Sequence, residues 1–204
     1  MSSSTDYQPA EDRQFDSYLQ IRAAQLEDVS SIAEILADSF HSKEGVLGWA
    51  YPLLRLGIYE DVRNRLRTYC GQHICLVAVN GTAKTNDPGK LYSSGENIAG
   101  TLEIAVRPTT LPWGSNYLRY PYLSNLAVRP SDRRQGIGVQ LLLSCEQVVR
   151  DWGFHDIYLH VLENNYQARQ LYFKLGYRLH QLDNSWSNRI FGRPQQILLH
   201  KHLP

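Results

Sequence analysis

The sequence predicts a mixed α/β domain in which helices cover a central sheet, with elements in the order β-α-α-β-β-β-α-β-α-β-β. Apolar residues recur at helical spacing in some segments and form alternating or β-branched runs in others. These two kinds of segment are interleaved along the chain, which is typical of helices packed on a sheet. The 204 residues suit one large domain, which can bury a sufficient core without disulfides or metals.

The composition excludes several classes of protein. Hydrophobic residues make up 43% of the chain and charged residues 20%, and the formal net charge is +1. This balance gives no overall field that would attract nucleic acid or a membrane surface, and no apolar run approaches the roughly 20 residues of a bilayer span. Neither the three cysteines nor the histidines show metal-ligand spacing. We therefore expect no metal, no nucleic acid and no membrane partner.

The N-terminal residues differ from the rest of the chain. Residues 1–18 are polar and predict a flexible tail, so the folded domain is expected over residues 19–204. The tail carries acidic groups and lacks the apolar stretch of a secretory signal. Scattered cysteines are typical of a reducing compartment. We expect a cytoplasmic protein, or a plastid stromal one if the source is a plant, acting as a monomer or homodimer.

The first part of the domain predicts a strand and two helices. A short apolar run at Leu19–Ala23 indicates a strand, and Leu26–Phe40 has apolar residues at helical spacing. A second helix is predicted within Val46–Cys70. Pro52 and Gly57 make the first half of that helix irregular, so its second half is the clearer part.

Three strands and two loops follow. His73–Asn80 is apolar and β-branched and ends at an Asn-Gly turn pair, after which residues 81–97 predict a polar loop. Ile98–Val106 predicts the next strand. Pro108–Tyr120 predicts a second loop, whose three aromatic residues could either wall a binding site or pack as a cap. Tyr122–Val128 predicts the third strand, which stops before an Arg-Pro pair.

The C-terminal part alternates between helices and strands. Gly136–Trp152 has one apolar face at helical spacing, and Asp156–Leu162 alternates as a strand does. Asn165–Leu175 predicts a short helix that stops at the glycine after it. Tyr177–Leu182 and Gln195–His202 predict the last two strands.

A glycine-containing turn before the longer of these helices suggests a phosphate site. Val128–Leu142 reads V-R-P-S-D-R-R-Q-G-I-G-V-Q-L-L, so a strand leads through a basic turn into a helix. The first N–H groups of a helix are unpaired and carry partial positive charge. Gly136 and Gly138 let a phosphate approach the backbone, and Arg133 and Arg134 add charge. The segment matches neither a Walker loop nor the dinucleotide fingerprint. On spacing alone it could also be a helix start without a ligand.

A second segment lies downstream and helps to interpret the first. From His160 to Tyr177 it reads H-V-L-E-N-N-Y-Q-A-R-Q-L-Y-F-K-L-G-Y. Together the two segments resemble the GNAT superfamily of acyl-CoA-dependent N-acyltransferases, and in particular its protein N-terminal acetyltransferases and plastid members. This resemblance implies the GNAT fold with its splayed central sheet. The matching motif positions are Arg133, Gly136, Gly138, Asn165, Ala168, Tyr172, Gly176 and Tyr177.

The resemblance also implies a site for acetyl-CoA as the co-substrate. In the family, a splayed strand pairs with the pantetheine arm, the glycine-containing turn holds the pyrophosphate, and the last helix contributes one further contact and a tyrosine beside the thioester sulfur. Carried over position by position, the expected cofactor-binding residues are Leu126, Ala127, Val128, Arg133, Arg134, Gln135, Gly136, Ile137, Gly138, Val139, Asn165 and Tyr172.

Acyl transfer to an amine needs a base, an oxyanion donor and an acid for the thiolate. The backbone N–H near Leu126 is the candidate donor. Tyr172 is the expected acid, unless it only packs beneath the following glycine. No carboxylate stands where many relatives carry their basic glutamate, so the resemblance implies Tyr122 and His160 as a water-mediated base. Two alternatives stay open: a structural role for His160, and Glu103 as the base.

These features predict an N-acetyltransferase in which a primary amine attacks acetyl-CoA directly in a ternary complex. The expected acceptor is a protein or peptide α-amine, with lysine ε-amines as a second activity. An α-amine with a pKa of about 8 needs less help from a base than a lysine at about 10.4. The alternatives are a small-molecule acceptor (a polyamine, an arylalkylamine or an aminoglycoside) and a non-catalytic acyl-CoA sensor.

Overall fold

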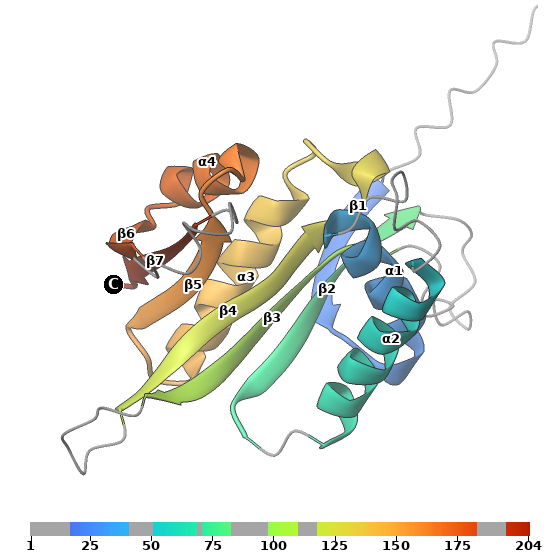
Figure 1. Cartoon of the computed structure of the whole chain (residues 1–204), viewed down its shortest axis with the longest axis horizontal. Coiled ribbons are helices and arrows are strands. Elements are labelled where there is room, and N and C mark those ends of the chain that lie inside the picture. The colour runs from blue at the N-terminus through green and yellow to red at the C-terminus, as the bar shows by residue number, and fades with distance from the viewer. Residues whose placement is uncertain (1–16, 41–50, 69–70, 83–97, 110–117, 183–194) are drawn as a thin grey trace, which may run out of the picture.

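The computed structural model describes residues 17–40, 51–68, 71–82, 98–109, 118–182 and 195–204. These residues form one seven-stranded sheet in the order β1-β2-β3-β4-β5-β7-β6, with helices on both faces (Figure 1). The strands are β1 (Ser17–Ala23), β2 (His73–Thr82), β3 (Ile98–Thr109), β4 (Leu118–Val128), β5 (Asp156–Leu162), β6 (Arg178–Leu182) and β7 (Gln196–His202).

Four α-helices and two short 3₁₀ turns connect the described strands. The helices are α1 (Val29–Phe40), α2 (Tyr51–Thr68), α3 (Ile137–Asp151) and α4 (Tyr166–Lys174). The 3₁₀ turns η1 (Leu26–Asp28) and η3 (Pro130–Asp132) come directly before α1 and shortly before α3. The predicted mixed α/β class and the predicted order of strands and helices are confirmed.

Several predicted boundaries were wrong where long-range contacts extend an element. Ser17, placed in the tail, pairs with Thr82 on β2, and the Asn-Gly pair expected to end β2 continues the strand because Gly81 pairs with Tyr18. Residues 1–16 lie outside the described part of the chain, as do most of the two predicted loops (83–97 and 110–117). The ends of the second loop are strand, since β3 and β4 pair as far as Thr109 and Leu118.

Helix α2 is also more regular than predicted. It begins at Tyr51, so Pro52 occupies its first turn, where no intrahelical N–H bond is lost. Gly57 lies inside the helix, and a Cβ added there would meet no atom within 4 Å. The proline and glycine therefore leave the first half of the helix intact.

The sheet opens between β4 and β5, the one parallel pair among the described strands. Their pairing covers only Tyr122 with Tyr158 and Leu123 with Leu159. Beyond this point β4 carries a register shift against β3, where Asn125 adopts a left-handed backbone with φ 54°. The last residues of β4 have no paired partner on β5, so the splayed sheet expected from the resemblance is present.

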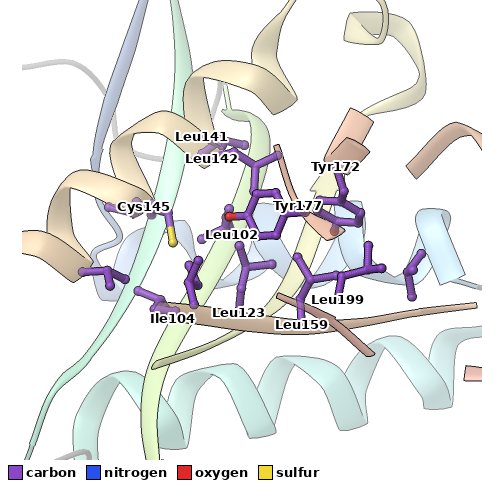
Figure 2. Close-up of a cluster of buried hydrophobic side chains, with 14 of the residues drawn as sticks. Leu102, Ile104, Leu123, Leu141, Leu142, Cys145, Leu159, Tyr172, Tyr177 and Leu199 are labelled. Carbon is purple, nitrogen blue, oxygen red and sulfur yellow. The ribbon is translucent and has the colours of Figure 1, made fainter. Parts of the chain in front are cut away.

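Apolar packing fixes this sheet from both sides. On one face, α3 covers β2, β3 and β4. The core between them includes the fully buried residues Leu102, Leu141, Cys145 and Tyr177 (Figure 2). On the other face, α1 and α2 pack over β2, β3 and β4 (Figure 1). The short helix α4 lies near β5 and β6, so the opening between β4 and β5 sits between two packed halves.

Candidate active site

A groove of about 640 Å³ begins where β4 and β5 separate. Its walls are the last residues of β4, the turn into α3, the first turn of α3 and one face of α4. Ten of the residues expected to bind the cofactor line it: Leu126, Ala127, Val128, Arg133, Arg134, Gly136, Ile137, Gly138, Val139 and Asn165.

The turn into α3 has the geometry of an anion site. Gly136 is the N-cap of α3 with φ 83°, and a Cβ there would meet nothing within 4 Å, so its backbone borders open space. Arg134 also has a left-handed backbone, with φ 68°. Both arginines of the turn are exposed, and Arg133 is oriented by a 3.1 Å bond from its Nε to the carbonyl of Val128. This turn therefore combines unpaired helix N–H groups, an open backbone at Gly136 and two exposed arginines, which together suit an anion.

Gly138 serves a different purpose from Gly136. A Cβ at Gly138 would lie 3.2 Å from Cδ2 of Leu171 on α4 and 3.9 Å from Cγ2 of Val128 on β4. Both neighbours line the groove. The absence of a side chain at this position therefore lets α3, α4 and β4 approach one another while the groove stays open.

Asn165 begins α4 and shows why this helix starts where it does. The backbone N–H of Ala168 donates to Asn165 Oδ1 at 3.2 Å, which is a standard N-cap bond. With Oδ1 used in this way, the side-chain NH₂ is the group that Asn165 could offer to a ligand. The helix ends before Gly176, whose φ of 92° is the left-handed conformation predicted from the sequence.

Two expected cofactor residues are placed differently from the other ten. Tyr172 lies in the core rather than on the groove wall: its side chain is buried and its ring packs 5.6 Å from that of Tyr177. Burial raises the pKa of Tyr172 well above its ordinary value, with smaller contributions from Cys145 and Tyr122. The Gln135 side chain folds back onto the turn and donates to the carbonyl of Ser131 at 3.5 Å.

Several residues that line the groove were not among the expected cofactor-binding residues. The lining residues in the turn and on α4 could have been predicted from the two motifs by helical spacing alone. The lining residue on α1 could not, because its position depends on tertiary packing. The additional lining residues are Ser39, Asp132, Gln167, Ala168, Gln170, Leu171 and Lys174.

Tyr122 and His160 are brought together by the short parallel pairing of β4 and β5. The Tyr122 hydroxyl lies 2.9 Å from His160 Nδ1. The Arg107 guanidinium lies 3.7 Å from the centre of the Tyr122 ring. Burial raises the pKa of Tyr122 above its ordinary value, although the positive charge of Arg107 acts in the opposite direction. The hydroxyl is therefore protonated at neutral pH and can hold a hydrogen bond to the imidazole.

Glu103 is close to this pair on the same face of the sheet, but it is fully engaged. Its Oε1 lies 2.6 Å from His73 Nε2 and 3.3 Å from Arg65 Nε, and its Oε2 accepts a 2.8 Å bond from Asn125 Nδ2. Burial alone would raise the pKa of Glu103, but the His73 bond, the Arg65 charge and the Asn125 bond together lower it. A carboxylate with a lowered pKa and occupied oxygens is a poor base.

The remaining described histidines make structural contacts or lie at the surface. His200 and His202 reach Asp156 Oδ1 at 2.7 and 3.1 Å, and His155 is exposed. Within the described ranges, no group of three or more His, Cys, Asp or Glu side chains is arranged to hold a metal ion. Among these same residues, no helix is both long enough and apolar enough to cross a membrane.

Comparison with known proteins agrees with this fold and identifies the family of the chain. The profile described as the Acetyltransferase (GNAT) family matches residues 59–177, more than half of the chain, so the chain belongs to this family. A curated relative, GCN5-related N-acetyltransferase 7, chloroplastic, from Arabidopsis thaliana, is 37% identical over 109 residues, or 53% of this chain and 37% of that protein.

Solved structures share the fold. The PaiA N-acetyltransferase of Thermoplasma acidophilum in complex with coenzyme A has a TM-score of 0.62 and 18% identity, over 91% of this chain and 99% of that one. The NatC complex bound to Gag peptide and coenzyme A has a TM-score of 0.57 and 15% identity, over 91% and 99%. The chain spans less than half the length of the curated relatives that it matches first.

Proposed function

We propose that the chain transfers the acetyl group of acetyl-CoA to the α-amino group of a peptide or protein, by direct attack in a ternary complex. The 2.9 Å contact between the Tyr122 hydroxyl and His160 Nδ1, next to the point where β4 and β5 separate, carries the proposal. It places a titratable pair beside the groove, where a base is needed.

The groove fits the shape and charge of acetyl-CoA. The N-terminus of α3 and the exposed Arg133 and Arg134 suit the pyrophosphate, and Gly136 has open space in front of it. The backbone of β4 from Leu126 to Val128 lacks a strand partner on β5, and apart from the Val128 carbonyl, which accepts from Arg133, it can pair with the pantetheine amides. Bound there, acetyl-CoA supplies an acyl thioester. Residue by residue, the chain supplies the anion site, the backbone donors and the proton-transfer groups.

Proton removal from the amine is assigned to Tyr122 and His160. In the arrangement that we favour, the protonated Tyr122 hydroxyl donates to His160 Nδ1. A water that takes the amine proton passes one to Tyr122, while the tyrosine proton moves to the imidazole. The solvent-exposed histidine then releases the proton to bulk water. General-base assistance of this kind contributes roughly 10²- to 10⁴-fold to a rate.

Tyr172 is assigned as the proton source for the departing thiolate. Burial raises the pKa of its hydroxyl, so the group is protonated at every pH at which the enzyme would act. The same burial makes the hydroxyl a weak acid. It can therefore protonate a thiolate that is shielded from water and strongly basic more readily than a thiolate that water stabilises. Tyr172→Phe, which keeps the ring against Tyr177, tests this role without removing core volume.

The acceptor class is proposed from amine chemistry and one structural neighbour, and the location from the curated relatives. An α-amine suits a neutral tyrosine–histidine pair better than lysine does, because less of the amine is protonated at neutral pH. One structural neighbour binds a peptide with coenzyme A, and this supports a peptide acceptor. Curated relatives from Arabidopsis thaliana, among them the one named above, are described as chloroplastic, which favours the plastid stroma over the cytoplasm.

The test uses one peptide with a free N-terminus and an internal lysine, incubated with protein and acetyl-CoA and analysed by fragmentation mass spectrometry. Acetyl on the α-amine is the expected result. Acetyl on lysine alone, or CoA release only with a panel of small amines, would overturn the acceptor assignment. Tyr122→Phe and His160→Gln are expected to lower kcat by about 100-fold with little change in the KM for acetyl-CoA. A His160→Gln protein with the wild-type rate and pH profile would refute the relay.

A further inference from the structure

Glu103, described above as a poor base, makes a set of contacts that suggests a different role. Its carboxylate joins three elements: His73 at the start of β2, Arg65 near the end of α2, and Asn125 on β4. The side chain is 9% exposed, so these bonds are shielded from water. Only the bond to Asn125 reaches the part of β4 that borders the groove.

Asn125 stands where the register of β4 changes. Ser124 pairs with Glu103 and Ala127 with Thr101, so Asn125 and Leu126 together stand opposite a single residue of β3. This is a β-bulge, and the left-handed backbone of Asn125 is part of it. Asparagine tolerates this conformation better than most residues, but still at some cost in free energy. The 2.8 Å bond to Glu103 Oε2 holds the bulge in place.

We propose that Glu103 is a positioning residue for acetyl transfer: through Asn125 it fixes the β4 bulge, so that the backbone N–H at Leu126 stays aimed at the thioester carbonyl. Because His73 and Arg65 hold the opposite oxygen, β2 and α2 determine where the carboxylate sits. The proposal rests on acetyl transfer as the function, and it does not depend on which amine is the acceptor.

The test compares Glu103→Gln, Asn125→Gly and the double variant with a matched control. Glycine allows the left-handed backbone but removes the amide, so it cuts the tie without adding strain. Each single variant is expected to lower kcat about ten-fold, less than the 10²–10³ lost when an oxyanion donor is removed outright. Glu103→Gln removes the charge that Arg65 and His73 hold, and Asn125→Gly removes the bond itself, so the double variant should lose no more than Asn125→Gly alone. Glu60→Gln, on the exposed side of α2, should match wild type.

Two readouts separate positioning from a base or a merely structural role. The KM for acetyl-CoA should change less than two-fold, and both limbs of the pH–rate profile should keep their positions. Loss of the acidic limb in Glu103→Gln alone would show that Glu103 is the base and overturn the proposal. Wild-type kcat in either single variant would also overturn it. If Glu103→Gln does not fold, Asn125→Gly carries the same comparison.

A third readout needs no acceptor. Calorimetry gives the ratio of the dissociation constants for CoA and acetyl-CoA, and this ratio should fall in both variants, by less than the two-fold limit on KM, because the carbonyl contact is weakened. An unchanged ratio would overturn the positioning role. If no peptide is acetylated by wild type but the ratio falls as expected, the acceptor assignment fails and the role of Glu103 stands.

Discussion

Replacing Gly138 by alanine tests whether the start of α3 is the phosphate site. The position lies in the first turn of α3 and has no left-handed φ, so alanine adds no backbone strain. The new methyl group would sit 3.2 Å from Leu171 Cδ2 and 3.9 Å from Val128 Cγ2, both of which line the groove. The substitution therefore acts on the space in the groove rather than on the fold.

The expected magnitudes differ sharply for stability and binding. Replacing glycine in a helix by alanine gains up to about 1 kcal/mol, and the tight contact with a rotatable leucine methyl offsets part of it. The free energy of unfolding should therefore change by less than about 1 kcal/mol. Hydrogen bonds to a charged group are worth roughly 1.5–3 kcal/mol each. Losing one by displacing the pyrophosphate from Gly138 weakens acetyl-CoA binding by about 10- to 100-fold.

Calorimetric titration with acetyl-CoA and thermal unfolding measure the two effects separately. The matched control is Gly57→Ala, in α2, where a Cβ meets no atom within 4 Å. It should raise stability slightly and leave the affinity unchanged. Wild-type affinity in a folded Gly138→Ala protein would refute the assignment of the pyrophosphate to this turn.

Three further predictions concern charged residues. Arg134→Gly removes a cation, so the affinity for acetyl-CoA should fall about ten-fold in low salt and less in high salt. Because glycine relieves the strain of the left-handed backbone, the free energy of unfolding should stay within about 1 kcal/mol of wild type. Calorimetry at two ionic strengths checks the change in affinity. Arg22→Met leaves the fully buried Asp28 without its bidentate partner and should cost about 3 kcal/mol in urea unfolding. The fold lowers the pKa of Glu103 from 4.5, so the ionised carboxylate stabilises the folded state above that pH, and this contribution is lost as the pH falls below it. On acidification below pH 4.5, the free energy of unfolding should therefore decline less in Glu103→Gln than in wild type.

The sequence predicted the C-terminal half of the fold closely because its signals are local. The N-cap bond at Asn165 and the left-handed glycine at 176 are short-range features, and α4 begins and ends where they indicate. The glycine turn before α3 is equally local, and this is why most of the expected groove residues line the groove.

The N-terminal boundaries depend on distant partners and were less predictable. The Asn-Gly pair after β2 is a turn signal in isolation, yet Gly81 continues the strand because β1 offers it a pairing partner. Pro52 is a helix breaker only away from the first turn, and the sequence does not reveal where α2 begins. In both cases a tertiary contact or a position within the helix decides against the local preference.

In the candidate site, too, the residue types could be predicted from the sequence, but their contacts depend on distant parts of the chain. Tyr122 and His160 could be proposed from family context, but they are 38 residues apart in the chain, and their contact follows only from the register of β4 against β5. Glu103 could be listed as a carboxylate on a strand, whereas its three partners come from β2, α2 and β4. Those partners, and not the residue type, decide that it is a poor base.

One structural event explains why the cofactor groove and the proton-transfer pair adjoin. The crossover through α3 makes β4 and β5 parallel, and the bulge at Asn125 ends their pairing after Leu123. Tyr122 lies on the paired side of that point, and His160 follows the last paired residue of β5, on the same face as the residue paired with Tyr122. The groove begins just beyond, at Leu126. A change in the register of β4 against β5 should therefore alter cofactor contacts and proton transfer together, whereas a change at the α3 turn should alter cofactor binding alone.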